Sequence, residues 1–149
     1  MPQASDDFKR RVREAFDALA VGQTYTWRRT FTDGDVSLFC GVTGDLNPYH
    51  LDDTFAAESF FGRRIVPGLL TASMLTHIGG MIGFLATEMT FRYLAPVYVG
   101  DTITATVTFV AKDEAAHSVT GEARSVNQHG DEVLAATFKG FPADLRLAH

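Results

Sequence analysis

The chain has 149 residues, the size of one domain, and 46% of them are hydrophobic, with twelve phenylalanines among them. This is enough apolar material for a sizeable core. The formal net charge of -5, with Lys and Arg scattered along the chain, argues against nucleic acid as a partner. Cys40 is the only cysteine, which excludes an internal disulfide, and the acidic N-terminus has no apolar signal core. We therefore expect one domain over residues 1–149, located in the cytoplasm.

The first part of the chain predicts short helices on either side of one strand. Apolar residues recur at helical spacing among charged neighbours near the N-terminus, which predicts an amphipathic helix that begins at Ser5 or Asp6. Residues 24–31 alternate and predict a strand. Asp33 is then a candidate cap for a short helix that ends at Gly44.

The middle of the chain is dominated by an apolar stretch. Residues 44–50 are polar and turn-prone, so we expect irregular structure there, followed by a short helix capped by Asp52 or Asp53. Residues 65–87 contain no Asp, Glu, Lys or Arg and predict a long apolar helix over residues 68–84. The stretch is nearly long enough to cross a membrane, but its proline, glycines and hydroxyls favour the buried centre of a domain.

The remainder of the chain predicts strands. They are expected over residues 88–94, 102–111, 117–127 and 132–138, and the last two are joined by a plausible hairpin turn. Consecutive antiparallel strands must bury one face, and the apolar helix is the available partner. We therefore predict an α+β fold in which a curved antiparallel sheet wraps one central helix.

Asp45 and His50 are the first candidate functional residues. They flank Pro48, which disfavours helix at the residue before it and bends the chain, so the two side chains can converge. A carboxylate beside an imidazole is a sound acid–base pair, because burial and mutual interaction tune both groups towards neutral pH. On spacing alone, a turn-forming aspartate and a structural histidine are the commoner interpretation.

Gly68 is a third candidate. It falls where the loop gives way to the long helix, so its backbone N–H is expected among the unpaired donors of the helix N-terminus. Such a donor suits a thioester carbonyl that acquires negative charge. The dipeptide Pro67-Gly68 is also an ordinary signal for the start of a helix, and on its own that is the simpler interpretation.

Three segments together make a family resemblance. Residues 39–50 (FCGVTGDLNPYH), 65–73 (IVPGLLTAS) and 91–101 (FRYLAPVYVGD) resemble, in the same order, the motifs of the (R)-specific enoyl-CoA hydratase or MaoC-like dehydratase family. The resemblance covers residues from about 24 to 140 and leaves out only the N-terminal helix. It implies the hot-dog fold, which agrees with the architecture predicted above.

The resemblance also implies a hydro-lyase. Its reaction would be the (R)-specific hydration of trans-2-enoyl-CoA to (R)-3-hydroxyacyl-CoA and the reverse dehydration. Asp45 and His50 are implied to activate one water, the Gly68 N–H to stabilise the enolate oxygen, and Asn47 to shape the loop and hydrogen-bond near the pair. The resemblance implies no cofactor and no membrane, and a homodimer or higher homo-oligomer that takes an acyl-CoA or an acyl-carrier-protein thioester.

Two other functions remain open on the sequence. A hot-dog thioesterase would also bind acyl-CoA, but such enzymes commonly carry a carboxylate on the central helix, which residues 68–86 lack. A non-catalytic acyl-thioester-binding protein would keep the fold without turnover. Pro67 and Tyr49 depart from the family pattern, in which His and an aliphatic residue are common, and these changes bear on acyl-chain preference.

Several further residues invite functional interpretation. His77 lies among apolar residues of the predicted central helix, so we expect a buried core residue. The spacing of the histidines suggests no metal site, and Cys40 has no evident basic partner to activate a thiol. Arg63 and Arg64 are candidates for contact with CoA phosphates, although two solvated surface charges are an equal alternative.

Overall fold

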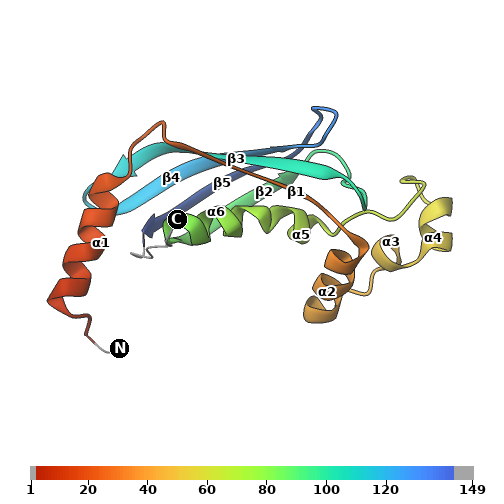
Figure 1. Ribbon diagram of the computed structural model, residues 1–149, viewed down its shortest axis with the longest axis horizontal. Helices are drawn as coiled ribbons and strands as arrows, with labels where there is room; N and C mark the ends of the chain where they lie inside the picture. Colours follow the sequence, from red (N-terminus) through yellow and green to blue (C-terminus); the bar gives the residue numbers. More distant parts are fainter. Residues whose placement is uncertain (1–2, 143–149) are drawn as a thin grey trace.

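A five-stranded antiparallel sheet curves along one side of the molecule in the computed structural model, which describes residues 3–142 (Figure 1). The strands follow the order β1-β3-β4-β5-β2. Their bounds are β1 Thr24–Thr30, β2 Phe84–Tyr93, β3 Thr102–Asp113, β4 Ser118–Val126 and β5 Glu132–Pro142. The predicted α+β architecture is therefore confirmed, and β1 and β2 form the two edges of the sheet.

The helices occupy three places around this sheet. In Figure 1, α5 and α6 run along one face of the sheet, α2, α3 and α4 lie beyond one end of it, and α1 lies at the other end. Their bounds are α1 Asp6–Ala18, α2 Asp33–Thr43, α3 Pro48–Leu51, α4 Asp53–Glu58, α5 Gly68–Ala72 and α6 Met74–Ile82. We call residues 31–67, which contain α2 to α4, the helical extension.

The caps of the first helices explain where the chain turns. Ser5 caps α1 by accepting a hydrogen bond from the Phe8 N–H, as expected. Thr32, not Asp33, caps α2, because it forms a reciprocal capping box with Asp35. The helix ends, as predicted, at Gly44, whose φ of 73° is left-handed and suits glycine.

The central helix is interrupted, contrary to the prediction of one helix over residues 68–84. Ser73 separates α5 from α6, and its hydroxyl donates to the Leu70 carbonyl over 2.6 Å. Such bonding from a side chain to the preceding turn competes with the backbone ladder. Gly83, with a φ of 64°, then ends α6, so β2 begins at Phe84 and not at the predicted residue 88.

The sheet and α6 enclose the core. The buried positions of β3 alternate with half-buried threonines over most of the strand, as the sequence pattern predicts. Aromatic rings from three strands meet at the centre, where Phe109 lies 5.7 Å from Phe84 and 6.2 Å from Phe138 between ring centroids. These separations are typical of favourable aromatic pairs.

His77 is exposed, so the expectation of a buried core histidine is wrong. His77 lies beside β1, the edge strand of the sheet. Its ring instead stacks on Trp27 of β1, with centroids 3.8 Å apart and planes 14° apart. Within residues 3–142, no helix has both the length and the apolar character needed to cross a bilayer.

Candidate active site

The loop between α2 and α3 is held by short side-chain to backbone hydrogen bonds. Thr43 Oγ1 accepts from the Asp45 N–H over 3.2 Å, and Asp45 Oδ1 accepts from the Asn47 N–H over 3.2 Å. Asn47 Oδ1 in turn accepts from the Tyr49 N–H and caps α3. These bonds fix the backbone on both sides of Asp45 and direct its carboxylate towards the start of α3.

The expected bend at Pro48 is present, but the segment is not wholly irregular as predicted. Pro48 is the first residue of α3, a position that suits its fixed φ and its missing N–H. Asn47 keeps an extended ψ of 127° just before it, so the chain turns there into a single helical turn. His50 follows within that turn and is therefore carried back towards Asp45.

His50 is buried, with 9% of its surface exposed, and its ring has a defined orientation. Nδ1 lies 2.8 Å from the carbonyl oxygen of Ile65. Because a carbonyl oxygen can only accept a hydrogen bond, Nδ1 must carry the proton. In the neutral ring, Nε2 therefore has a free lone pair, and this atom faces Asp45.

Nε2 of His50 lies 3.8 Å from Oδ2 of Asp45. This gap is too long for a direct hydrogen bond, and in the neutral tautomer both atoms are acceptors. One water molecule placed between them can donate a hydrogen to each. The Asp45 side chain is 45% exposed and the His50 side chain 11% exposed. Solvent therefore reaches the carboxylate, whereas the imidazole is buried.

Ile65 connects this pair to the start of α5. Its N–H donates to the Tyr49 carbonyl over 3.1 Å, while its carbonyl accepts from His50. The next residue, Val66, donates to the Val97 carbonyl over 2.7 Å, which anchors the strand-like segment to the loop between β2 and β3. The backbone that orients His50 thus leads directly through Pro67 into Gly68.

Gly68 is the first residue of α5, so its N–H has no acceptor within the helix. A Cβ added at Gly68 would lie 2.8 Å from the Tyr93 ring, and glycine is therefore required for this close approach. Ser73 separates α5 from α6, so the helix that Gly68 begins has five residues. The local N–H remains as the donor at this position.

A cavity of about 480 Å³ lies beside Gly68. Its walls come from the helical extension, from α5 and from the loop after β2, and they include Phe61, Ile65, Thr71, Tyr93 and Val97. A smaller cavity of about 160 Å³ lies between α6 and the start of β2. Both are lined mainly by apolar side chains, so the face of the central helix offers room for an apolar chain.

Arg64 has a structural role, which corrects the suggestion that it contacts CoA phosphates. It bonds to Asp53 over 2.6 Å and to Asp33 over 2.8 Å, and it also donates to the His50 carbonyl. These carboxylates raise the pKa of Arg64, the bond to Asp33 contributing most. The side chain, 18% exposed, therefore ties α2, α3 and α4 together.

Of the predicted residues, Asp45 and His50 lie close together and Gly68 begins α5. The Ile65 carbonyl was not predicted, because a backbone acceptor leaves no residue-type signal. The Asn47 side chain caps α3 and is not itself bonded to the pair. Burial, with a smaller contribution from the charge of Asp45, raises the pKa of the Cys40 thiol, which disfavours the reactive thiolate. In the described part of the chain, no cluster of His, Cys, Asp and Glu could hold a metal ion.

Known proteins are similar to this chain in both sequence and fold. The model of the MaoC-like domain matches residues 18–131. An (R)-specific enoyl-CoA hydratase of Rhodospirillum rubrum is 33% identical over 97 residues, which cover 62% of this chain and 67% of that protein. A 3-hydroxybutyryl-CoA dehydratase of Methylorubrum extorquens is 37% identical over 92 residues, which cover 59% of each. The chain thus spans less than two thirds of this second relative.

A solved structure agrees with these relatives. The (R)-hydratase of A. caviae, described as involved in PHA biosynthesis, superposes with a TM-score of 0.80 at 31% identity, over 84% of this chain and 98% of that one. The predicted hot-dog fold is confirmed by this similarity. The chain therefore belongs to the MaoC-like domain family and, like these relatives, is a hydratase or dehydratase, that is, a hydro-lyase.

Proposed function

We propose that this protein catalyses the (R)-specific hydration of trans-2-enoyl-CoA to (R)-3-hydroxyacyl-CoA, and the reverse dehydration. The observation that carries the proposal is the 3.8 Å gap between His50 Nε2 and Asp45 Oδ2, two acceptors set to hold one water. The hydratase and dehydratase names of the relatives support the same reaction class.

The residues divide the reaction as follows. The water between Asp45 and His50 loses a proton to the pair while its oxygen forms a bond to C3 of the enoyl chain. The C2=C3 electrons move towards the thioester, whose oxygen becomes an enolate that accepts a hydrogen bond from the Gly68 N–H. The pair returns a proton to C2 on the same face, so that the net change is addition of one water. Asn47 supports this arrangement by holding the loop.

The apolar cavities beside the central helix support an acyl substrate. The larger cavity adjoins Gly68, where the thioester carbonyl must lie, and the smaller one borders α6 further along. Apolar walls with few polar groups are typical of sites that bind hydrocarbon chains.

We also propose that the protein is a homodimer. The edge strand β2 has β5 as its one neighbour, and apolar residues of α2 and of the loop after it lie exposed near the site, among them Leu38, Val42 and Leu46. Exposed apolar stripes and open strand edges are features that oligomers cover. A stable monomer in sedimentation at micromolar concentration would contradict this assembly.

Incubation with crotonyl-CoA distinguishes the proposal from its rivals. Hydration removes the ultraviolet absorbance of the conjugated thioester without releasing a thiol, whereas a thioesterase removes the same absorbance and releases free CoA. A non-catalytic binding protein gives neither signal. The absence of carboxylates from α5 and α6 favours hydration over hydrolysis. Loss of absorbance accompanied by an equal release of thiol would overturn the proposal.

A further inference from the structure

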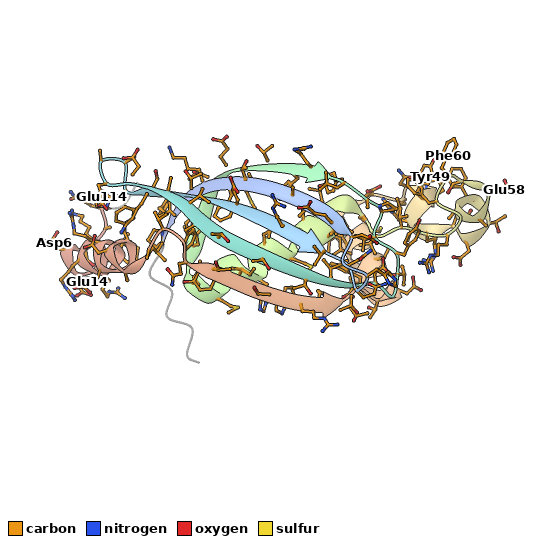
Figure 2. All side chains as sticks on the ribbon, turned by 90° about the horizontal axis from the view of Figure 1, so that it is seen from above. Asp6, Glu14, Tyr49, Glu58, Phe60 and Glu114 are labelled. Carbon is orange, nitrogen blue, oxygen red and sulfur yellow. The ribbon has the colours of Figure 1, made fainter. Side chains whose placement is uncertain are left out.

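A tight turn at the tip of the helical extension presents an aromatic side chain to solvent. Phe60 is fully exposed, at 104% relative exposure, and Figure 2 shows it at the far end of the molecule from α1. An exposed phenylalanine ring gives up the favourable free energy that burial would contribute. A single exposed apolar residue is ordinary, so its surroundings decide whether it has a use.

The backbone beneath Phe60 is held in place by several bonds. The Gly62 N–H donates to the Ser59 carbonyl over 3.1 Å, and Gly62 adopts a left-handed φ of 69°. The Ser59 hydroxyl donates to the Ala56 carbonyl and accepts from the Phe61 N–H. The exposed ring is thus carried by a fixed turn. This favours binding, because the backbone loses little conformational entropy when a ligand binds.

Arg63 lies directly after this turn and is supported by Tyr98. The Tyr98 hydroxyl donates to the Phe61 carbonyl over 3.2 Å, and the Arg63 guanidinium lies 4.1 Å from the centroid of the Tyr98 ring. Within residues 3–142, no carboxylate lies within ion-pair distance of Arg63, although its neighbour Arg64 has two such partners. Arg63 is therefore a pre-positioned cation whose N–H donors can bind an anion.

The turn is also adjacent to the candidate active site. Phe61, between Phe60 and Arg63 in sequence, lines the cavity that contains Gly68. A substrate whose thioester lies at Gly68 and whose carrier arm leaves the cavity past Phe61 reaches this turn. An exposed aromatic face and, three residues further along the chain, a guanidinium without a carboxylate partner in the described residues match a ligand with a purine ring and phosphates.

We infer that Phe60 and Arg63 form a subsite for the adenine nucleotide end of a coenzyme A thioester, with the purine on Phe60 and a phosphate on Arg63. This inference rests on the proposed function. The charge of the helical extension points the same way: it carries six Asp and Glu against two Arg. A carrier protein that is itself acidic would be repelled over this wide surface, whereas a nucleotide needs only the local cation.

The test compares one enoyl group on two carriers, coenzyme A and pantetheine, which lacks the nucleotide. We expect Arg63→Gln and Phe60→Leu each to lower the ratio of kcat/KM between the two thioesters about tenfold, the scale expected from loss of a phosphate contact or a stacked base. Arg124→Gln, which removes another exposed arginine, on β4, should leave the ratio unchanged. An unchanged ratio in both Phe60→Leu and Arg63→Gln overturns the inference.

A binding measurement separates this inference from the proposed function. Titration with adenosine 3′,5′-bisphosphate needs no turnover, and Arg63→Gln should weaken its binding about tenfold. Glu58, which lines the same hollow as Phe60, should oppose the phosphates, so Glu58→Gln should strengthen binding. If the nucleotide binds but neither thioester is hydrated, only the proposed reaction fails. Faster turnover of an enoyl-acyl-carrier protein than of enoyl-CoA contradicts the subsite.

Discussion

Nδ1 of His50 lies 2.8 Å from the carbonyl oxygen of Ile65, and this contact decides which ring nitrogen faces Asp45. Because the carbonyl fixes the proton on Nδ1, Nε2 is the basic atom of the neutral ring. Only Val66 and Pro67 separate Ile65 from Gly68, the proposed donor to the enolate. One short backbone segment therefore positions both the proposed base and the proposed oxyanion donor.

The first prediction concerns the charge of Asp45. Asp45→Asn keeps the shape of the side chain but replaces a carboxylate with an amide, so it can no longer share in accepting a proton from the water. We expect kcat for hydration of crotonyl-CoA to fall about 100-fold or more. Loss of the absorbance of the conjugated thioester measures this rate.

The melting temperature of Asp45→Asn should stay close to that of the parent protein, because Asp45 is largely exposed and holds only the short loop bond to Asn47. Asp17→Asn, an equally small change on exposed α1, serves as the control and should retain full activity. Full activity in Asp45→Asn would remove this carboxylate from the mechanism.

The second prediction uses two glycines of the central helices. In Gly68→Ala the new Cβ meets the Tyr93 ring at 2.8 Å, so the ring or the start of α5 must shift. Overpacking of this kind costs about 1–3 kcal/mol, and the displaced N–H should also lower kcat. Thermal unfolding and the hydration assay measure the two effects.

Gly80→Ala is the matched control for this pair. Gly80 lies in α6 and a Cβ there has no atom within 4 Å, so alanine should stabilise the helix by about 0.5–1 kcal/mol. If the two alanine variants change stability in the same direction, the close approach of Tyr93 to Gly68 is not what requires glycine there.

The candidate site could be proposed from the sequence where its chemistry depends on residue type. Asp45, His50 and the bend at Pro48 could be read from the sequence, because a proline restricts its neighbour and only a few side chains exchange protons near neutral pH. The Ile65 carbonyl could not, since every residue carries one. The role of Arg64 also needed coordinates, because its partners Asp33 and Asp53 are distant in sequence.

The fold was predictable in its elements and less so in their ends. The alternation of residues 102–111 correctly indicates β3, but the strand continues to Asp113 because β4 pairs with it that far. Apolar pattern alone predicted helix up to Phe84, whereas the left-handed Gly83 ends α6 and Phe84 already pairs with β5. His77 was misplaced because sequence does not reveal that this position of α6 lies at the edge strand β1, where the ring stays exposed.

The third prediction follows from the stack of His77 on Trp27, the only tryptophan of the chain. His77→Ala removes the ring that covers the indole, so the fluorescence emission of Trp27 should shift to longer wavelength. The loss of an aromatic pair should cost about 0.5–1.5 kcal/mol of unfolding free energy. Thr76→Ala, at the neighbouring exposed position of α6, should leave the emission unchanged. An unshifted spectrum in His77→Ala would show that the stack does not shield Trp27 in solution.

The fourth prediction is a pH dependence set by Asp35 in the capping box of α2. The Thr32 backbone N–H, followed by the Thr32 hydroxyl and the Arg29 guanidinium, lowers the pKa of Asp35 below its ordinary value of 3.8 despite partial burial. A carboxyl with a lowered folded-state pKa stabilises the fold fully above its unfolded-state pKa and loses that contribution as pH falls through the folded-state value.

Asp35→Asn should therefore destabilise the protein at about pH 7 by about 1–2 kcal/mol, the scale of a lost cap interaction. The difference in melting temperature between parent and variant should shrink once the pH falls below about 4. Because the two proteins share every other carboxyl, comparing them at each pH cancels the general effect of acid. A gap that stayed constant down to about pH 3 would mean that the capping bond stabilises α2 independently of the charge of Asp35.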